Sequence, residues 1–345
     1  MKKKTESFRL TDYVIFISVM LAAMVLCICL GSVNVPLKDI YYAISDTFNG
    51  TELCNTSHRA IIMSVRLPRV CCAALTGAAL SICGAAMQGL LQNPLADGST
   101  LGVTSGAALG AILSIAFGMN LPMLANLGQM GMAMLFGFMS LVLILTLAYR
   151  LDKSLSTQTI ILIGVIFSMF VSAIINLVVT FAGERVKNIT FWSMGSLSGS
   201  SFENAGILLI AVTVFGSIIL KCARELNAFA IGEDNARNIG VDVKKFKLII
   251  LITVSALIGV TVSIAGTIGF VGLVIPHMTR LIVGPNHRRL LPASFFGGST
   301  FLLLADLVAR TMLRPLVLPI GVVTSFIGSI VFIYIFYSSR RKSHA

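Results

Sequence analysis

A few charged side chains stand at the edges of long apolar segments, and their types favour the binding of carboxylates. Arg66 and Arg69 lie on either side of a Leu-Pro pair, just before an uncharged apolar run. Guanidinium groups hold carboxylates through paired hydrogen bonds, although arginines in such a place also anchor a protein at lipid headgroups. Asp306 and Arg310 are four residues apart, so on a helix they share one face and can form an ion pair.

Motifs for catalysis, metal binding and nucleotide binding are missing from the sequence. His277 stands beside Arg280 with no second His or Cys at ligand spacing, so no metal site is expected. The chain has no Gly-Lys pair and therefore no GxxxxGK[ST] phosphate-binding loop, and it has no HExxH pattern. We expect a chain that is not an enzyme and binds no cofactor itself.

The segment 221–247, KCARELNAFAIGEDNARNIGVDVKKFK, is a polar island between apolar runs, and six of its residues are Lys or Arg. The positive-inside rule places it in the cytoplasm. Gly232 and Gly240 bracket a short segment with acids at its start and a glycine where a helix would stop. Such a helix is either a solvated connector or a docking element for a soluble partner. A docking element could also transmit the motion of its partner to the spans on either side, and its candidate coupling residues are Gly232, Glu233, Ala236, Arg237 and Gly240.

The composition is that of a polytopic membrane protein. Hydrophobic residues make up 56% and charged residues 12% of the chain, and its mean hydropathy is +0.93. Because a span needs about 20 apolar residues, we expect an all-α bundle in a single domain, 1–345. The ten expected spans are 13–33, 70–91, 99–117, 123–148, 159–182, 205–220, 248–264, 270–283, 290–312 and 316–337. Those near 205, 248 and 270 are short, which predicts tilted or broken helices.

The distribution of basic residues sets the expected orientation. With ten spans and both termini in the cytoplasm, 18 of the 26 lysines and arginines fall on the cytoplasmic side. The net charge of +12 is spread over loops between spans, so contact with anionic lipid headgroups explains it and nucleic-acid binding is not expected.

Helix breaks are expected at two places. Asn93-Pro94 follows a span rich in Gly, Ala, Ser and Cys that can pack closely in the middle of the bundle. Gln88 and Asn93 are expected to satisfy backbone groups freed by this break. Pro276 is expected to break the span 270–283.

Several long motifs, in this order, resemble the iron-complex, haem and vitamin B12 importer permeases, the FecCD-like family. They are RLPRV, GAALSICGAAMQGLLQNPLADGSTLGVTSGAALGA, IGEDNARNIGV, GTIGFVGLVIPHMTRLIVGPNHRRLLP, ADLVAR and LPIGVVTSFIGSIVFIYI. The resemblance implies a ten-span permease subunit of a type II ATP-binding-cassette importer in the cytoplasmic membrane of a bacterium. Its implied partners are a second, identical or different, permease subunit, two cytoplasmic ATP-binding subunits that hold ATP and Mg, and an extracellular or periplasmic substrate-binding protein.

The resemblance also implies roles for individual residues. Arg66, Arg69 and Arg310 match arginines at the outer face that meet acidic residues of the binding protein, and the segment 232–240 matches the loop that lies against the ATPase. The fifth and tenth spans would border the translocation path. Their candidate path residues are Ser168, Ser172, Asn176, Thr324 and Ser325, for which ordinary helix packing is an equal alternative.

The sequence therefore predicts an importer permease, with a ferric siderophore as the expected cargo and haem or cobalamin as alternatives. An ion-driven secondary transporter is a second class to consider. Such transporters place carboxylates in the middle of the membrane, whereas the expected span interiors here have essentially none.

Overall fold

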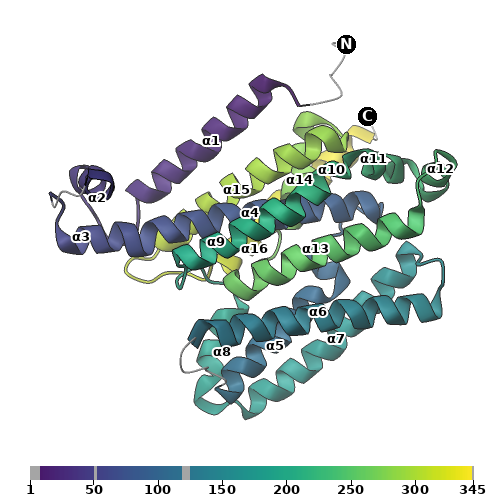
Figure 1. The fold of residues 1–345 in the computed structure, drawn as a ribbon, viewed down its shortest axis with the longest axis horizontal. Helices are drawn as coiled ribbons and strands as arrows, with labels where there is room; N and C mark the ends of the chain where they lie inside the picture. Colours follow the sequence, from purple (N-terminus) through teal and green to yellow (C-terminus); the bar gives the residue numbers. More distant parts are fainter. Residues whose placement is uncertain (1–7, 50–52, 119–124, 344–345) are drawn as a thin grey trace.

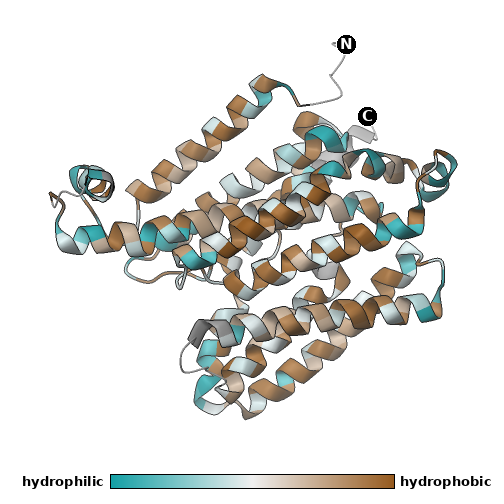
Figure 2. Ribbon diagram, in the orientation of Figure 1, coloured by the Kyte–Doolittle hydropathy of each residue, from teal (hydrophilic) through white to brown (hydrophobic). Residues whose placement is uncertain are grey.

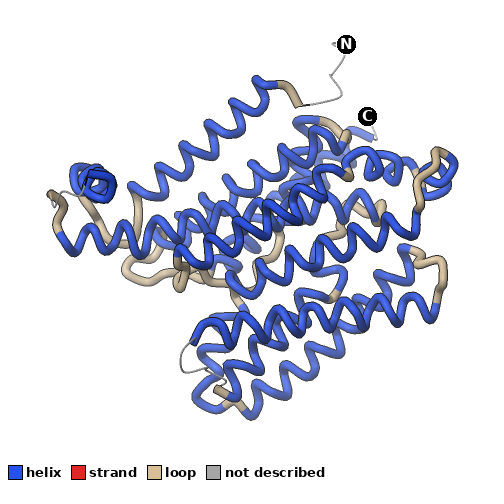
Figure 3. Tube along the Cα trace, in the orientation of Figure 1, coloured by secondary structure: helices blue, strands red, loops and turns tan. Residues whose placement is uncertain are grey.

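In the computed structural model, residues 8–49, 53–118 and 125–343 are described, and they form helices and loops without a strand (Figure 3). Ten apolar helical segments run through the molecule, as the sequence predicts. Seven are long enough to cross a membrane, and α5, α14 and the apolar part of α16 are shorter. The ten segments are α1 (Leu10–Cys29), α4 (Leu67–Leu90), α5 (Val103–Phe117), α6 (Ala125–Leu151), α7 (Thr157–Phe181), α9 to α10 (Phe202–Lys221), α13 (Val243–Ala265), α14 (Val271–Val283), α15 (His287–Thr311) and α16 (Ile320–Ser343).

Short helices lie at the two ends of this bundle (Figure 1). The end with α11 (Ala223–Ile231) and α12 (Glu233–Asn238) is called the inner end, after the predicted orientation. The opposite, outer end carries α2 (Leu37–Asn49), α3 (Thr56–Ala60) and α8 (Val186–Ser193). The start of α1 and the end of α16 both lie toward the inner end in Figure 1, as an even number of spans requires. Brown apolar residues fill the middle of the helices in Figure 2, and teal polar residues gather at both ends.

The helix that contains the two arginines of RLPRV is longer than the sequence suggests. It runs without interruption from Thr56 to Leu90, through a π-helical turn over Ile61–Arg66. The helix therefore begins well before residue 70, where the sequence predicts the start of this span. Leu67 donates its N–H to the carbonyl of Ile62, five residues back, and this wider turn is compatible with the ring of the proline that follows.

The lengths of the remaining spans differ from expectation in two places. The span near 248 is not short, because α13 has 23 residues and continues through charged residues at its inner end. Asp242 caps this start by accepting a hydrogen bond from the backbone N–H of Lys245, at 3.1 Å. The span near 205 also has 20 residues. The short helices are α14, as predicted, and α5, with 13 and 15 residues.

Pro276 does not break its helix, contrary to the prediction, because a side chain replaces the hydrogen bond that proline cannot make. α14 continues through Pro276 to Val283. Without an N–H on residue 276, the carbonyl of Gly272 loses its helical donor. The amide Nε2 of Gln88 donates to this carbonyl at 3.4 Å and to that of Leu273 at 3.1 Å. Gln88 thus serves freed backbone groups, but these belong to α14 and not to the Asn93-Pro94 break, where the sequence predicted them.

Helix α4 lies in the middle of the bundle, as its small residues predict, and 83% of its apolar window is buried. Its glycines bring it into backbone contact with two neighbours. A Cβ on Gly77 would lie 2.2 Å from the carbonyl oxygen of Gly298 in α15, and one on Gly84 would lie 1.8 Å from that of Gly272 in α14. Only glycine allows these approaches.

Replacing Gly84 with alanine should therefore destabilise the fold, whereas Gly206→Ala in α9 should not, because a Cβ there meets open space. Overpacking of this kind costs about 1–3 kcal/mol and sometimes more. Thermal unfolding of the detergent-purified variants measures the effect. An unchanged midpoint for Gly84→Ala would show that the α4–α14 contact relaxes without cost.

Candidate functional site

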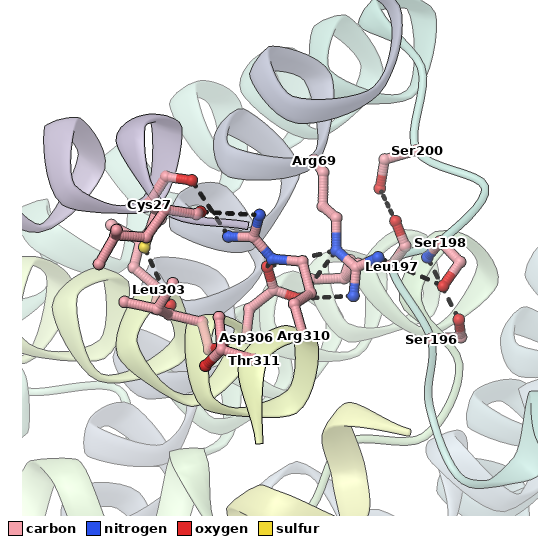
Figure 4. Close-up of polar contacts among 12 residues, drawn as sticks. Cys27, Arg69, Ser196, Leu197, Ser198, Ser200, Leu303, Asp306, Arg310 and Thr311 are labelled. Atoms are coloured by element: carbon pink, nitrogen blue, oxygen red, sulfur yellow. Dashed lines mark hydrogen bonds and ion pairs between the residues drawn. The ribbon is translucent and has the colours of Figure 1, made fainter. Parts of the chain in front are cut away.

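An ion cluster at the outer end joins Arg69 of the RLPRV motif to Asp306 and Arg310 of the ADLVAR motif. Asp306 and Arg310 lie on α15 and form the predicted pair, with Oδ2 and Nε 2.8 Å apart. Arg69 of α4 approaches the same carboxylate, with Nη2 2.8 Å and Nε 2.9 Å from Oδ1. Figure 4 shows Asp306 between the two guanidinium groups. Arg69 also donates to the hydroxyl of Ser198, at 3.3 Å, which ties the loop after α8 to the cluster.

Two of the three arginines, Arg66 and Arg310, also close the outer end of α1. The last carbonyls of a helix lack partners within it, and cations are favourable there. Arg66 donates from Nη1 to the carbonyls of Ile28 and Cys29 at 2.8 and 3.2 Å, and Arg310 donates to the carbonyl of Cys27 at 3.3 Å. Helix α1 has no basic residue in its own last turn. The arginines of the 56–90 helix and of α15 thus cap it.

This arrangement corrects the expectation that the arginines face outward. Arg66, Arg69 and Arg310 are 3%, 6% and 4% exposed. They are buried because α1 and the loop after it cover Arg66 and Arg310, while α15 and the loop at Ser198 cover Arg69. Their role in docking a binding protein stays a prediction, but they lack the exposed guanidinium groups that direct carboxylate recognition needs.

At the inner end, the predicted short helix and its glycine stop are present. α12 covers Glu233–Asn238, with φ of +137° at Gly232 and +90° at Gly240. The N–H groups of Gly240 and Val241 bond back to the carbonyls of Arg237 and Ala236, both at 3.0 Å, which ends the helix.

The candidate residues of α12 divide between two faces. Ala236 is buried, and Glu233 turns inward, where its Oε1 lies 2.5 Å from Nζ of Lys247. Arg237 faces outward and pairs only with its exposed neighbour Asp234, at 3.3 Å.

Apolar side chains on both sides of α12 are exposed, and sequence reasoning missed them. Ile231 is 75% and Ile239 71% exposed. The available signal was that each isoleucine stands directly beside one of the glycines that bracket the short helix. Together with the outward face of α12 they form an apolar-edged protrusion of the kind that fits a groove.

Two cavities of about 810 and 900 Å³ adjoin α16 and α7. The first, called the α16 cavity, is lined by Ser325 and reaches across to Ile258 of α13. The second, called the α7 cavity, is lined by Ser168, Ser172 and Asn176. Four of the five candidate path residues thus line a cavity. The fifth, Thr324, is fully buried and donates to the carbonyl of Gly321 at 3.2 Å, as a packing residue would.

The two cavities share Asp97, Gly269 and Phe270. Asp97 was not among the residues singled out in the sequence, although an acid just after the Asn93-Pro94 break was a usable signal. Among the described residues that line either cavity, Asp97 is the one with an ionisable side chain. Phe270 has a φ of +69° at the start of α14. Most of the remaining wall is apolar or carries hydroxyl groups, so the cavities suit a large cargo and lack a charged filter.

A ten-segment bundle with cavities beside α7 and α16, and with a protruding short helix at one end, defines a membrane permease. The profile of the FecCD transport family matches residues 19–338. The chain belongs to this family and is the permease subunit of a type II ABC importer.

Similar proteins agree with this assignment. The uncharacterized ABC transporter permease protein YvrB of Bacillus subtilis is 40% identical over 336 residues, which cover 96% of this chain and 95% of that protein. The cobalamin import system permease protein BtuC of Halobacterium salinarum is 37% identical over 306 residues, or 88% and 80% of the two chains. A solved structure, described as an inward-facing metal-chelate type ABC transporter, has a TM-score of 0.83 at 30% identity and covers 95% of this chain and 99% of its own.

Loss of the carboxylate at Asp306 should destabilise the protein strongly. Asp306→Asn leaves Arg69 and Arg310 buried without their counter-ion, and breaking a buried pair from one side costs about 3–5 kcal/mol. Asp234→Asn is the matched control, because it removes an exposed ion pair worth about 0–1 kcal/mol. Unfolding midpoints in detergent compare the two. Similar midpoints would mean that the buried arginines find other partners.

Proposed function

We propose that this permease imports a ferric siderophore. The α16 cavity and the α7 cavity each have a volume of several hundred Å³. Among the described residues that line them, Asp97 is the one with an ionisable side chain. This wall suits a bulky chelate with an apolar or uncharged periphery better than a bare ion. The solved relative described as a metal-chelate transporter supports the same class of cargo. Haem and cobalamin remain the alternatives, because other relatives are named for haemin, cobalamin and molybdate import.

We propose that the importer has two permease and two ATP-binding subunits and that α12 meets the ATPase. The exposed Ile231 and Ile239 support this contact, since apolar side chains beside a short helix favour a protein groove. The start of α1 and the end of α16 lie toward the same end of the bundle as α12 (Figure 1). This supports cytoplasmic termini in the cytoplasmic membrane of a bacterium.

ATP-dependent import tests the proposed function directly. The purified chain alone should show no ATP hydrolysis, because it lacks a phosphate-binding loop. In proteoliposomes with its ATP-binding subunit and binding protein, it should import one chelate of a panel of ferric siderophores, haemin and cobalamin. Hydrolysis by the chain alone would contradict the permease role. Uptake of haemin or cobalamin in place of any siderophore would overturn the cargo assignment.

We also propose that the binding protein docks on the outer end, above the three buried arginines. Their guanidinium groups lie beneath the surface, where water screens their charge less than that of an exposed group. They also hold the end of α1 and the loop at Ser198 in place. A positive field and a fixed surface together support docking of an acidic partner.

Arg66→Ala should therefore weaken binding of the binding protein more than Arg314→Ala, which changes an exposed arginine at the same end. The affinity of detergent-solubilised permease for the immobilised binding protein, measured at low and high salt, gives the comparison. The unfolding midpoint of each variant shows whether it is folded. If folded wild type and folded Arg66→Ala bind the binding protein with equal affinity, Arg66 only caps α1 and has no role in docking.

A further inference from the structure

Lys247 is a fully buried lysine at the inner end of the bundle, with 0% of its surface exposed. Lysine is almost never fully buried unless its ammonium group is paired. Here Nζ lies 2.5 Å from Oε1 of Glu233 and donates to the carbonyl of Leu155 at 2.9 Å. These three residues belong to α13, to α12 and to the turn between α6 and α7. One ammonium group therefore connects three separate segments of the chain.

The turn between α6 and α7 holds the Leu155 carbonyl in place. Leu155 is buried and has a φ of +52°, a conformation that costs energy for a residue other than glycine. Asp152 fixes the turn by accepting hydrogen bonds from the N–H groups of Ser154 and Ser156, at 2.8 and 3.0 Å. Hydrogen bonds from the Ser154 and Ser156 side chains and backbone hold the pKa of Asp152 well below its usual value. Asp152 therefore stays ionised, and able to accept these hydrogen bonds, to lower pH than an ordinary aspartate.

Glu233 reaches the first residue of α7 as well as Lys247. The hydroxyl of Thr157 donates to the same Oε1 atom, at 3.1 Å. Glu233, Lys247, Leu155 and Thr157 consequently form one connected group, called here the Lys247 joint. It links α12 to the start of α7 and to the inner part of α13.

The two helices that leave the joint lead to the two cavities. α7 carries Ser168, Ser172 and Asn176 of the α7 cavity, and α13 carries Ile258 and Val262 of the α16 cavity. The outward side of α12 bears the exposed Ile231 and Ile239, while Glu233 points inward. A force applied to the outward side therefore reaches both helices through contacts that already exist.

We infer that Lys247 and Glu233 are positioning residues that transmit displacement of α12 to α7 and α13, and so couple the ATPase to the cavities. This inference rests on the proposed function, in which α12 meets the ATPase. Glu233, which was expected to take part in coupling to the ATPase, would do so through an internal connection to Lys247. The buried ammonium group suits this task, because Glu233 and the Leu155 carbonyl take the place of water as its partners.

Lys247→Met tests the joint, because methionine fills a similar volume without the charge. Exposed Lys245→Met, two residues away on the same helix, is the matched control. Both variants are reconstituted with the ATP-binding subunit and the binding protein, and ATP hydrolysed per chelate imported is measured. We expect this ratio to rise on the order of tenfold in Lys247→Met, within the usual range of coupling between sites, and to stay unchanged in Lys245→Met.

A merely structural role would lower the unfolding midpoint and both activities together, leaving the ratio unchanged, and that result would overturn the inference. Glu233→Gln serves where Lys247→Met does not fold, since it keeps the shape of the side chain and should raise the same ratio. In the double variant the ratio should rise no further than in the larger single variant, because both changes break one connection. Additive effects would contradict a shared joint.

Hydrogen exchange separates failure of the joint from failure of the proposed function. Addition of the ATP-binding subunit should slow exchange at residues 231–240 and 153–160 in the wild type, but only at 231–240 in Lys247→Met. A wild type that imports no chelate refutes the proposed function, whatever its exchange. A wild type that imports cargo, with no change at 153–160, refutes the joint alone.

Discussion

The close approach of α4 to α14 and α15 is the contact on which the rest of the bundle depends. Apolar burial against a neighbour gains little in lipid, so helices there associate through van der Waals contact and hydrogen bonds. Glycines 77 and 84 let backbones touch where any side chain would separate them. The same proximity places Gln88 within reach of the Gly272 carbonyl, and Pro276 is tolerated inside α14 for that reason. Packing and hydrogen bonding therefore depend on each other here. Moving α4 outward would also remove the Gln88 amide that donates to the Gly272 carbonyl of α14.

Three buried cations bind backbone carbonyls, two at the outer end of the bundle and one at the inner end. Arg66 and Arg310 take the last carbonyls of α1 at the outer end, and Lys247 takes that of Leu155 at the inner end. Two of these cations also meet a carboxylate, Asp306 or Glu233. Burying a charge is costly unless its partners are all present, so these groups fix which segments meet. A few buried ionic groups consequently determine which segments meet at the ends of the bundle, whereas close packing of the helices determines the contacts in its middle.

The sequence predicts what depends on neighbouring residues and misses what depends on distant ones. Ten apolar segments, the short helix ended by Gly240, and the Asp306–Arg310 pair follow from local patterns and are present. Gln88 was assigned the right kind of partner, but 184 residues separate it from Gly272. Burial of Arg66 and Arg310 depends on α1 and its following loop folding over them, and burial of Arg69 depends on α15 and the loop at Ser198, which no local pattern shows. Lys247 belonged to a charged run that the positive-inside rule places in solvent, yet its partner Leu155 lies 92 residues away.

The walls of the two cavities are made partly of main chain, and this has an evolutionary consequence. Thr267 to Phe270, Asp97 and Gly98 line the cavities from segments outside the long helices, next to the starts of α5 and α14. Gly98 and Gly269 have no side chain and can line a wall only with backbone atoms, so the backbone itself lends these walls polarity. A mutation replaces a side chain but leaves the peptide groups. Substitutions of serines and apolar residues on α7 and α16 can therefore adapt the cavities to a new cargo during evolution. The polar backbone part of the walls is kept through these substitutions.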